Sequence, residues 1–223
     1  MGPAPPSSGR SPVVAAAYCG TVVRVTNQRK PRGPYRKGVE RREQILQAAL
    51  EVFAQHGDRG SSLQEIADRV GVTQPALLHY FGSREELLLA VIEQRDTLGR
   101  HVSAETKKPG DIAAQAVRHS MDQPGLIRLF VALSAAATDP AHTAHSFFVD
   151  RYQNLTNLIS SGLEEGQRAG QVRTDEPADQ MARLLLAVMD GLQIQWLLDP
   201  SIDMPAMVAT FTRMYTAWLP ASA

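Results

Sequence analysis

The chain has 223 residues, of which 43% are hydrophobic, 21% charged and only 6% aromatic, a composition that is ordinary for a soluble globular protein. The formal net charge is zero, but residues 1–100 carry 14 Lys and Arg against 10 Asp and Glu, whereas residues 101–223 carry 9 against 13. The single cysteine, Cys19, excludes an intramolecular disulfide, and apolar runs too short for a membrane span favour a cytoplasmic protein without a membrane partner.

Residues 1–34 are rich in Pro, Gly, Ser and Arg and show no sustained periodicity, so we interpret them as a disordered arm. Seven cations lie between Arg29 and Arg42, and only Glu40 opposes them. Such a charge would suit a polyanion, and the arm could enter a minor groove of DNA. A solvated tail without a fixed partner is the simpler interpretation of the charge alone.

Two helices are predicted before residue 71. The first begins near Val39 and ends at Gly57 or Gly60, and the spacing i, i+4, i+7 and i+8 gives it one apolar face: Ile45, Ala49, Val52 and Phe53. Ser62 and Glu65 then have the spacing of a capping box. The short helix that follows has its own apolar face: Leu63, Ile66, Ala67 and Val70.

A turn containing Gly71 precedes a third helix from about Thr73 to Phe81. Helix, turn and helix together have the layout of a helix-turn-helix. At about 100° per residue, one side of the third helix carries Ala76, Leu77 and Tyr80. The other side carries Gln74, Pro75, Leu78 and His79.

The second set suits the floor of a major groove, because Gln can pair with adenine and apolar groups can contact thymine methyls. A tight helical corner with no role in DNA binding is an equal alternative from the spacing alone. Ser62 and Ser83 each begin a helix, where free N–H groups favour phosphate, and Arg84 adds a charge beside Ser83.

The remaining chain also has helical periodicity. A helix from about Arg84 to Arg100 follows a second capping box, Ser83 and Glu86, and five more helices are predicted at 111–121, 124–137, 140–169, 176–198 and 203–219. We therefore predict an all-α fold of about nine helices. Its parts are a basic arm (1–34), a helix-turn-helix domain (35–85) and a helical domain for effector binding and dimerisation (86–223).

No catalytic constellation is visible in the sequence, which contains no phosphate loop and no His-Glu-x-x-His motif. His142 and His145 are three residues apart, near Asp139, but surface polar groups at a helix start are the simpler interpretation. We expect no enzyme activity, no metal and no cofactor. A helical enzyme and an architectural or interaction module whose helix-turn-helix does not read sequence remain alternatives.

The stretch Ile45–Leu88 resembles the N-terminal domain of the TetR family of bacterial regulators. The resemblance rests on Ile45, Ala48, Ala49, Phe53 and Gly57, then on Ser62, Ile66, Ala67, Gly71 and Val72, and on the runs Thr73-Gln-Pro-Ala-Leu-Leu-His-Tyr-Phe81 and Ser83-Arg-Glu-Glu-Leu87. The run Asp190–Asp199 is similar to the eighth helix of many actinobacterial members. The resemblance therefore implies the all-α fold of this family and the function of a DNA-binding regulator.

By position, the resemblance implies base contacts from Thr73, Gln74, Pro75 and His79. It implies phosphate contacts from Ser62, Tyr80 and Arg84. The chain departs from the family pattern at Leu78, where an aromatic residue is usual, and at Arg84, where Lys is usual. The arm is also longer than is typical.

The resemblance further implies a repressor that binds a palindromic double-stranded DNA operator as a homodimer and is released by an unknown small-molecule effector. The family's dimer is a four-helix bundle made by the last two helices, for which the candidates are Leu184, Leu185, Val188, Leu192, Met207, Phe211 and Met214. The family's effector pocket lies in the helical body, where the candidates are Phe130, Phe147, Tyr152, Met189 and Gln193. Phe148 and Trp196 are further candidates for that pocket, although each of these residues could equally be core.

Overall fold

The computed structural model describes residues 34–60, 62–104 and 109–216, and within these residues the chain forms helices and no strand. The helices are α1 (Pro34–Gly60), α2 (Leu63–Val70), α3 (Gln74–Phe81), α4 (Arg84–Ala104), α5 (Pro109–Met121), α6 (Pro124–Ala136), α7 (His145–Arg168), α8 (Ala178–Leu198) and α9 (Met204–Thr216). The predicted all-α fold is confirmed. The predicted arm lies outside the described residues, except that Pro34 begins α1.

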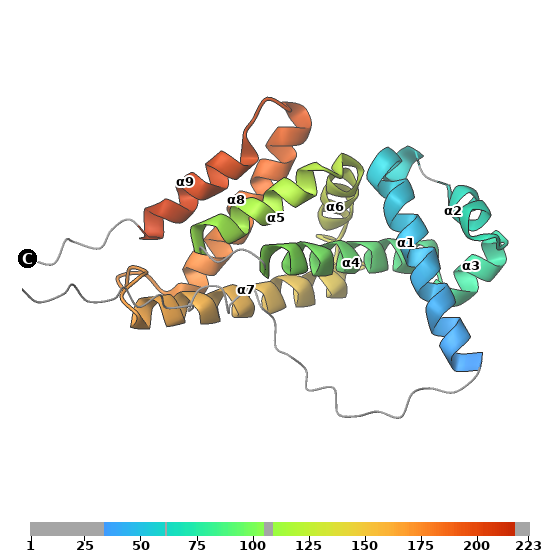
Figure 1. Ribbon diagram of the computed structural model, residues 1–223, viewed down its shortest axis with the longest axis horizontal. Helices are drawn as coiled ribbons and strands as arrows, with labels where there is room; N and C mark the ends of the chain where they lie inside the picture. The colour runs from blue at the N-terminus through green and yellow to red at the C-terminus, as the bar shows by residue number, and fades with distance from the viewer. Residues whose placement is uncertain (1–33, 61, 105–108, 217–223) are drawn as a thin grey trace, which may run out of the picture.

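Helices α1, α2 and α3 form one end of the molecule, and α4 and α7 run lengthwise toward the other end, where α5, α8 and α9 lie (Figure 1). Helix α1 begins earlier than predicted, at Pro34, since proline fits the first turn of a helix, where no N–H bond is needed. The predicted apolar face of α1 is confirmed, because its four members are almost fully buried: Ile45, Ala49, Val52 and Phe53.

The predicted cap at Ser62 forms, and a second cap, which was not predicted, forms at Thr73. Ser62 Oγ accepts a hydrogen bond from Glu65 N at 3.0 Å, and Thr73 Oγ1 accepts one from Ala76 N at 3.3 Å. Gly71 ends α2 with φ of 67°, a left-handed conformation that glycine adopts without steric cost. These caps keep α2 and α3 short and hold the turn between them.

Helix α7 begins at His145, five residues later than predicted. The preceding turn is built from side chains, since Asp139 Oδ1 accepts from Ala141 N at 2.9 Å and His142 Nδ1 accepts from Ala144 N at 3.1 Å. Polar side chains that bond to nearby backbone groups compete with helix formation. His142 is therefore part of the turn, and His145, the first residue of α7, has its Nδ1 atom 2.9 Å from Ala137 O.

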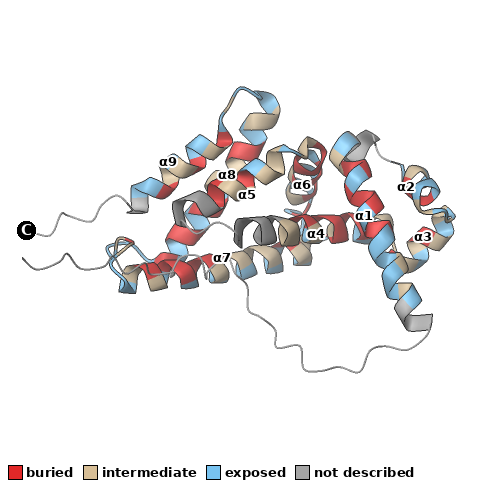
Figure 2. Cartoon of the chain, in the orientation of Figure 1, coloured by how far each residue is buried: buried red, intermediate tan, exposed pale blue. Residues whose placement is uncertain are grey.

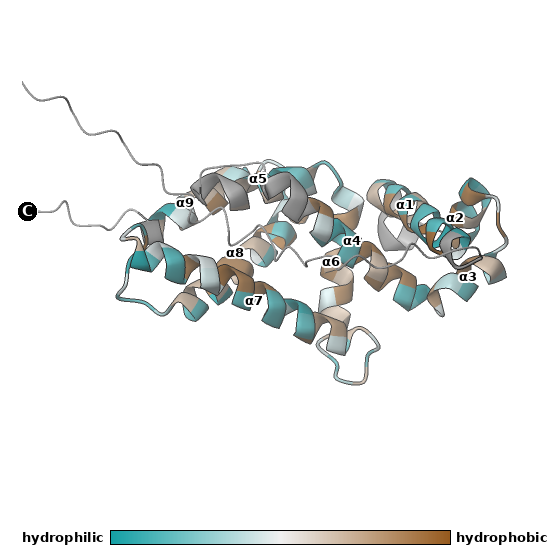
Figure 3. Ribbon diagram, turned by 60° about the horizontal axis from the view of Figure 1, so that its bottom comes forward, coloured by the Kyte–Doolittle hydropathy of each residue, from teal (hydrophilic) through white to brown (hydrophobic). Residues whose placement is uncertain are grey.

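One hydrophobic core joins the helix-turn-helix to the body, as buried residues of α1, α2 and α3 pack with those of α4, α6 and α7. In Figure 3, apolar stretches of α4 and α6 lie between the N-terminal helices and the rest of the body. A second core lies between α5, α6, α7, α8 and α9. Figure 2 shows the buried residues of both cores as red segments facing inward.

Gly125, at the start of α6, marks a close approach between the helical body and the N-terminal helices α1, α2 and α3, which we call the head from here on. A Cβ atom built on Gly125 would lie 2.0 Å from Phe53 O and 2.5 Å from Ala54 O, both backbone atoms of α1. Only a residue without a side chain therefore permits α6 to pack at this distance from α1.

Helix α8 has 21 residues and is long and apolar enough to cross a membrane, by length and composition alone. No such segment was predicted from the sequence. About a third of its apolar window is buried (33%), and α8 packs against α6, α7 and α9. A core helix of a globular protein passes the same test.

Candidate functional site

Helix α3 is held against the core by two side chains, Leu77 and Phe81, which are 0% and 4% exposed. The guanidinium of Arg42 lies 4.6 Å from the centroid of the Phe81 ring. Phe81 was predicted only as the end of the helix, and its burial makes it the second anchor. These anchors orient the opposite side of α3 toward solvent.

Along that opposite side, Thr73, Pro75 and His79 are exposed and Gln74 is half-buried. The His79 ring meets the edge of the half-buried Tyr80 ring at 6.1 Å and 72°. Leu78 differs from its predicted outward position, since it is half-buried and packs against the core. An apolar side chain at the border of a helix gains more from this packing than from exposure.

The starts of α2 and α4 lie on either side of α3 in the chain, and both helices contact it. The capping hydroxyls of Ser62 and Ser83 each accept a backbone N–H, at 3.0 Å in both cases. A hydroxyl that accepts one bond still has its own hydrogen to donate. Arg84 is half-buried in the first turn of α4. The three side chains therefore provide donors next to α3.

Part of the basic run has a structural role. Arg41 Nη1 donates to the backbone oxygen of Val70 at 3.0 Å, at the end of α2, while Arg42 packs on Phe81. These two cations hold the helix-turn-helix together. The members between Arg29 and Arg32 lie outside the described residues.

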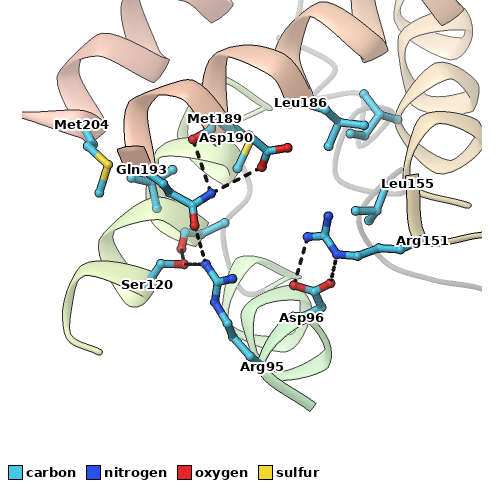
Figure 4. Close-up of a pocket in the computed structure, with 13 residues that line it drawn as sticks. Arg95, Asp96, Ser120, Arg151, Leu155, Leu186, Met189, Asp190, Gln193 and Met204 are labelled. Atoms are coloured by element: carbon cyan, nitrogen blue, oxygen red, sulfur yellow. Dashed lines mark hydrogen bonds and ion pairs between the residues drawn. The ribbon is translucent and has the colours of Figure 1, made fainter. Parts of the chain in front are cut away.

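A cavity of about 110 Å³ lies within the body, between α4, α5, α7 and α8 (Figure 4). Four charged side chains line it: Arg95, Asp96, Arg151 and Asp190. The other lining residues are apolar or neutral: Ala116, Val117, Ser120, Leu155, Ile159, Leu186, Met189, Gln193 and Met204. Met189 and Gln193, both proposed from the sequence as pocket residues, are among them.

Five other sequence candidates do not line this cavity, because their aromatic rings pack on one another or face other surfaces. Phe130 lies 5.8 Å from Phe148 between ring centroids, and Phe148 also contacts Phe147 and Tyr152, at 5.4 and 6.3 Å. Phe147 borders an open groove along α7, and Tyr152 borders a depression over α7 and α8. Trp196 is half-buried and packs against the second core.

The charged residues of the cavity were not identified from the sequence. Arg151 binds Asp96 with two hydrogen bonds, Nε to Oδ2 at 2.6 Å and Nη2 to Oδ1 at 3.2 Å. Arg95 Nη2 donates to Gln193 Oε1 at 2.9 Å and to Ser120 Oγ at 3.4 Å. The residues of this network are far apart in the chain, so sequence spacing could not bring them together.

One signal did exist in the sequence. Leu88, Val91, Ile92 and Arg95 have the spacing i, i+3, i+4 and i+7 of a single helix face. The first three are fully buried and Arg95 is only 8% exposed. A charge on an apolar face indicates a buried polar site.

Burial sets the charge balance of the cavity. Burial lowers the pKa of Arg95, and burial raises the pKa of Asp190 despite the hydrogen bond from Tyr152 at 2.6 Å. For Arg151, burial lowers the pKa, but the charge and hydrogen bonds of Asp96, together with Asp190 and Tyr152, raise it overall. Burial therefore favours the protonated form of Asp190.

The apolar candidates on α8 and α9 divide between two faces. Leu184, Met207 and Met214 are exposed, and Val188 and Phe211 are half-buried. Leu185 and Leu192 are instead only 4% and 9% exposed and lie in the second core of the same subunit. Two further apolar residues of α8, Ile194 and Leu198, are exposed but were not predicted as interface residues.

Among the described residues, no three His, Cys, Asp or Glu side chains gather in a group that could hold a metal ion.

Two family models match the chain. The model described as "Bacterial regulatory proteins, tetR family" matches residues 45–91, and "BetI-type transcriptional repressor, C-terminal" matches residues 110–219. Among curated relatives, the HTH-type transcriptional repressor AcnR of Corynebacterium efficiens is 29% identical over 160 residues, which cover 70% of this chain and 81% of the relative. The HTH-type transcriptional activator FasR of Mycolicibacterium smegmatis is 43% identical over 72 residues, 30% of this chain and 33% of the relative.

Solved structures share the fold. A TetR-family regulator from Rhodococcus sp. superposes with a TM-score of 0.67 at 19% identity, over 80% of this chain and 99% of that one. A transcriptional regulator from Saccharomonospora viridis in complex with choline gives a TM-score of 0.62 at 20% identity, over 78% and 96%. The two family models match most of the described chain, one its N-terminal part (45–91) and the other its C-terminal part (110–219). The relatives are regulators rather than enzymes. The chain belongs to the TetR family and is a DNA-binding transcriptional regulator.

Proposed function

We propose that this regulator is a ligand-responsive repressor, which acts in the cytoplasm as a homodimer on a palindromic operator and leaves DNA when a small molecule binds its body. The functional division follows the predicted domains, with residues 35–85 binding DNA and 86–223 binding the effector and the second subunit. The AcnR repressors support repression, since the alignment with them spans 70% of the chain, whereas that with the FasR activator spans 30%.

One helix carries this proposal. Helix α4 begins at Arg84 beside the reading helix, and Arg95 and Asp96 of the same helix line the cavity. At 1.5 Å per residue, the two places are about 17 Å apart along one continuous helix. A ligand that binds one position of α4 better than another would therefore shift the equilibrium between DNA-binding states.

In the DNA complex, helix α3 occupies the major groove. Base contacts come from Thr73, Gln74, Pro75 and His79. Phosphate contacts come from Ser62, Tyr80, Ser83 and Arg84. The caps support these roles, because the hydroxyl hydrogens of Ser62 and Ser83 remain available next to the starts of α2 and α4.

Substitution Gln74→Ala is expected to weaken discrimination at one base pair of each half-site by about 5- to 150-fold, the equivalent of one lost bidentate contact. The measurement is competitive binding to the best duplex selected from a random library and to its single-base variants. The slope of log affinity against log salt should stay the same, since Gln74 neutralises no phosphate.

The matched control is Gln153→Ala, which removes an exposed glutamine of α7 in the body. It should leave affinity and base preference as they are. An unchanged base preference in Gln74→Ala would contradict the reading role of Gln74, and a flat salt slope in the wild type would contradict DNA binding by this surface.

Substitution Leu184→Glu is expected to convert the dimer to monomers. Leu184 is 58% exposed on α8, which packs against α9, and a charge buried without a partner in the dimer would oppose association. The measurement is sedimentation at a fixed protein concentration. The control is Val149→Glu, an equally exposed apolar position on α7 (52%), which should stay dimeric. A dimeric Leu184→Glu variant would place the interface elsewhere.

A further inference from the structure

The polar groups around the cavity contain more donors than acceptors. Arg95 Nη1 and Arg151 Nη1 are both buried and have no hydrogen-bond partner. The carboxylates, in contrast, are occupied. Both oxygens of Asp96 accept from Arg151, while Asp190 accepts from Tyr152 at Oδ2 and from Gln193 at Oδ1. A buried guanidinium nitrogen without an acceptor is costly.

Arg95 is the more exceptional of the two arginines. Its guanidinium has two hydrogen-bonding partners, Gln193 and Ser120, and both are neutral. It also lies 5.2 Å from the centroid of the Phe130 ring, which attracts the charge but provides no lone pair. Arg95 is therefore a buried cation that no carboxylate among the described residues contacts directly, and in Figure 4 its side chain points from α4 toward the middle of the lining residues.

The other lining residues restrict the size and the character of a ligand. A cavity of about 110 Å³ is smaller than the ~300–1,000 Å³ of sites for drug-sized ligands. Opposite Arg95, much of the wall is apolar: Val117, Leu155, Ile159, Leu186, Met189 and Met204. Such a wall suits a short hydrocarbon group and disfavours a fully hydrated ion such as inorganic phosphate.

We propose that the effector of this regulator is a small monocarboxylate, whose carboxylate pairs with Arg95 and whose short apolar group packs between α5, α7 and α8. The ligand would supply the acceptors that the cavity lacks and the anion that Arg95 lacks. Planar guanidinium and planar carboxylate pair through two parallel hydrogen bonds. This assignment rests on the proposed function of the cavity as the effector site.

The first experiment uses the full-length wild-type dimer without DNA. Isothermal titration with acetate, butyrate and benzoate is compared with butyramide, butylammonium and inorganic phosphate at one pH and ionic strength. At least one carboxylate should bind saturably, and butyramide should bind at least about tenfold more weakly, the effect of one charge-assisted bond. Binding of butylammonium or phosphate in preference to the carboxylates overturns the proposal, and so does the absence of binding by all three carboxylates.

The second experiment locates the site. Arg95→Gln keeps a polar side chain of moderate length but removes the charge, and it should weaken carboxylate binding at least about tenfold. Arg128→Gln, the same change at an exposed arginine of α6 that does not line the cavity, should keep the binding. Thermal melts of both variants monitor folding, and if Arg95→Gln does not fold, the wild-type comparison of butyrate with butyramide decides the outcome. Undiminished binding in a folded Arg95→Gln variant overturns the role of Arg95.

A third measurement separates this inference from the proposed function. Affinity for the selected DNA duplex is measured with and without the carboxylate that binds most tightly. Weakened DNA binding supports both proposals. Carboxylate binding without an effect on DNA would retain the ligand class and overturn the effector role, whereas the Gln74→Ala variant should bind the carboxylate normally.

Discussion

Substitution Asp96→Ala is expected to lower the free energy of unfolding by about 3–5 kcal/mol, because it removes one partner of a buried ion pair. Asp96 and Arg151 join α4 to α7, and their side chains are only 17% and 12% exposed. The variant leaves the guanidinium of Arg151 buried, with its Nη1 already lacking a partner. Urea unfolding followed by circular dichroism at pH 7 and fixed protein concentration measures the loss.

Two controls test this explanation. The double substitution Asp96→Leu with Arg151→Met removes both charges and should recover most of the lost stability, since an apolar pair has no buried charge. Asp175→Ala breaks the ion pair with Arg173 on the surface and should leave the unfolding curve unchanged, because solvent screens that pair. A double variant as unstable as the single one would show that lost packing, and not an unpaired charge, explains the effect.

Substitution Gly125→Ala is expected to destabilise the fold by about 1–3 kcal/mol or more, the usual effect of overpacking a core. The added Cβ would lie 2.0 Å from the backbone oxygen of Phe53, which cannot rotate away as a side chain can. Helix α6 must therefore move from α1. Since this contact joins the DNA-binding head to the body, DNA affinity should fall as well, at temperatures where the variant remains folded.

Gly38→Ala is the matched control, because it makes the same change within α1 at a position where a Cβ would meet nothing within 4 Å. It should be neutral or stabilise the protein by up to about 1 kcal/mol, as alanine favours helix. Thermal unfolding of both variants, together with titration of the selected duplex, makes the comparison. Wild-type stability in Gly125→Ala would mean that α1 and α6 separate easily.

The local features of the head could be predicted because short-range rules control them. Ser62 caps α2 through a bond that spans three residues, as predicted, and Gly71 ends α2 in the conformation that its lack of a side chain allows. The cap at Thr73 follows the same rule but was not predicted. The side-chain bonds in the turn before α7 are equally local. They were not predicted, because the apolar periodicity of the neighbouring residues favoured a longer helix. The predicted helix therefore began too early, at residue 140 instead of His145.

The face of a residue on its helix was less predictable than the helix itself. Leu184 and Leu185 are adjacent and equally apolar, but the first is 58% exposed and the second 4%. Leu78 faces outward by periodicity, yet it packs at the edge of the core. In each case the neighbouring helices decide the environment, and the pattern of one helix does not contain that information.

The sequence by itself determined the all-α class, the helix-turn-helix with its caps, and the family, because each depends on residues close together in the chain. Only the tertiary structure decided which side chains form the cavity. Arg95 and Gln193 are 98 positions apart and 2.9 Å apart in space, and Asp96 meets Arg151 across 55 positions. Burial then gives these groups their chemistry, since a guanidinium without a carboxylate is unremarkable in water and becomes a binding site for an anion where water is excluded.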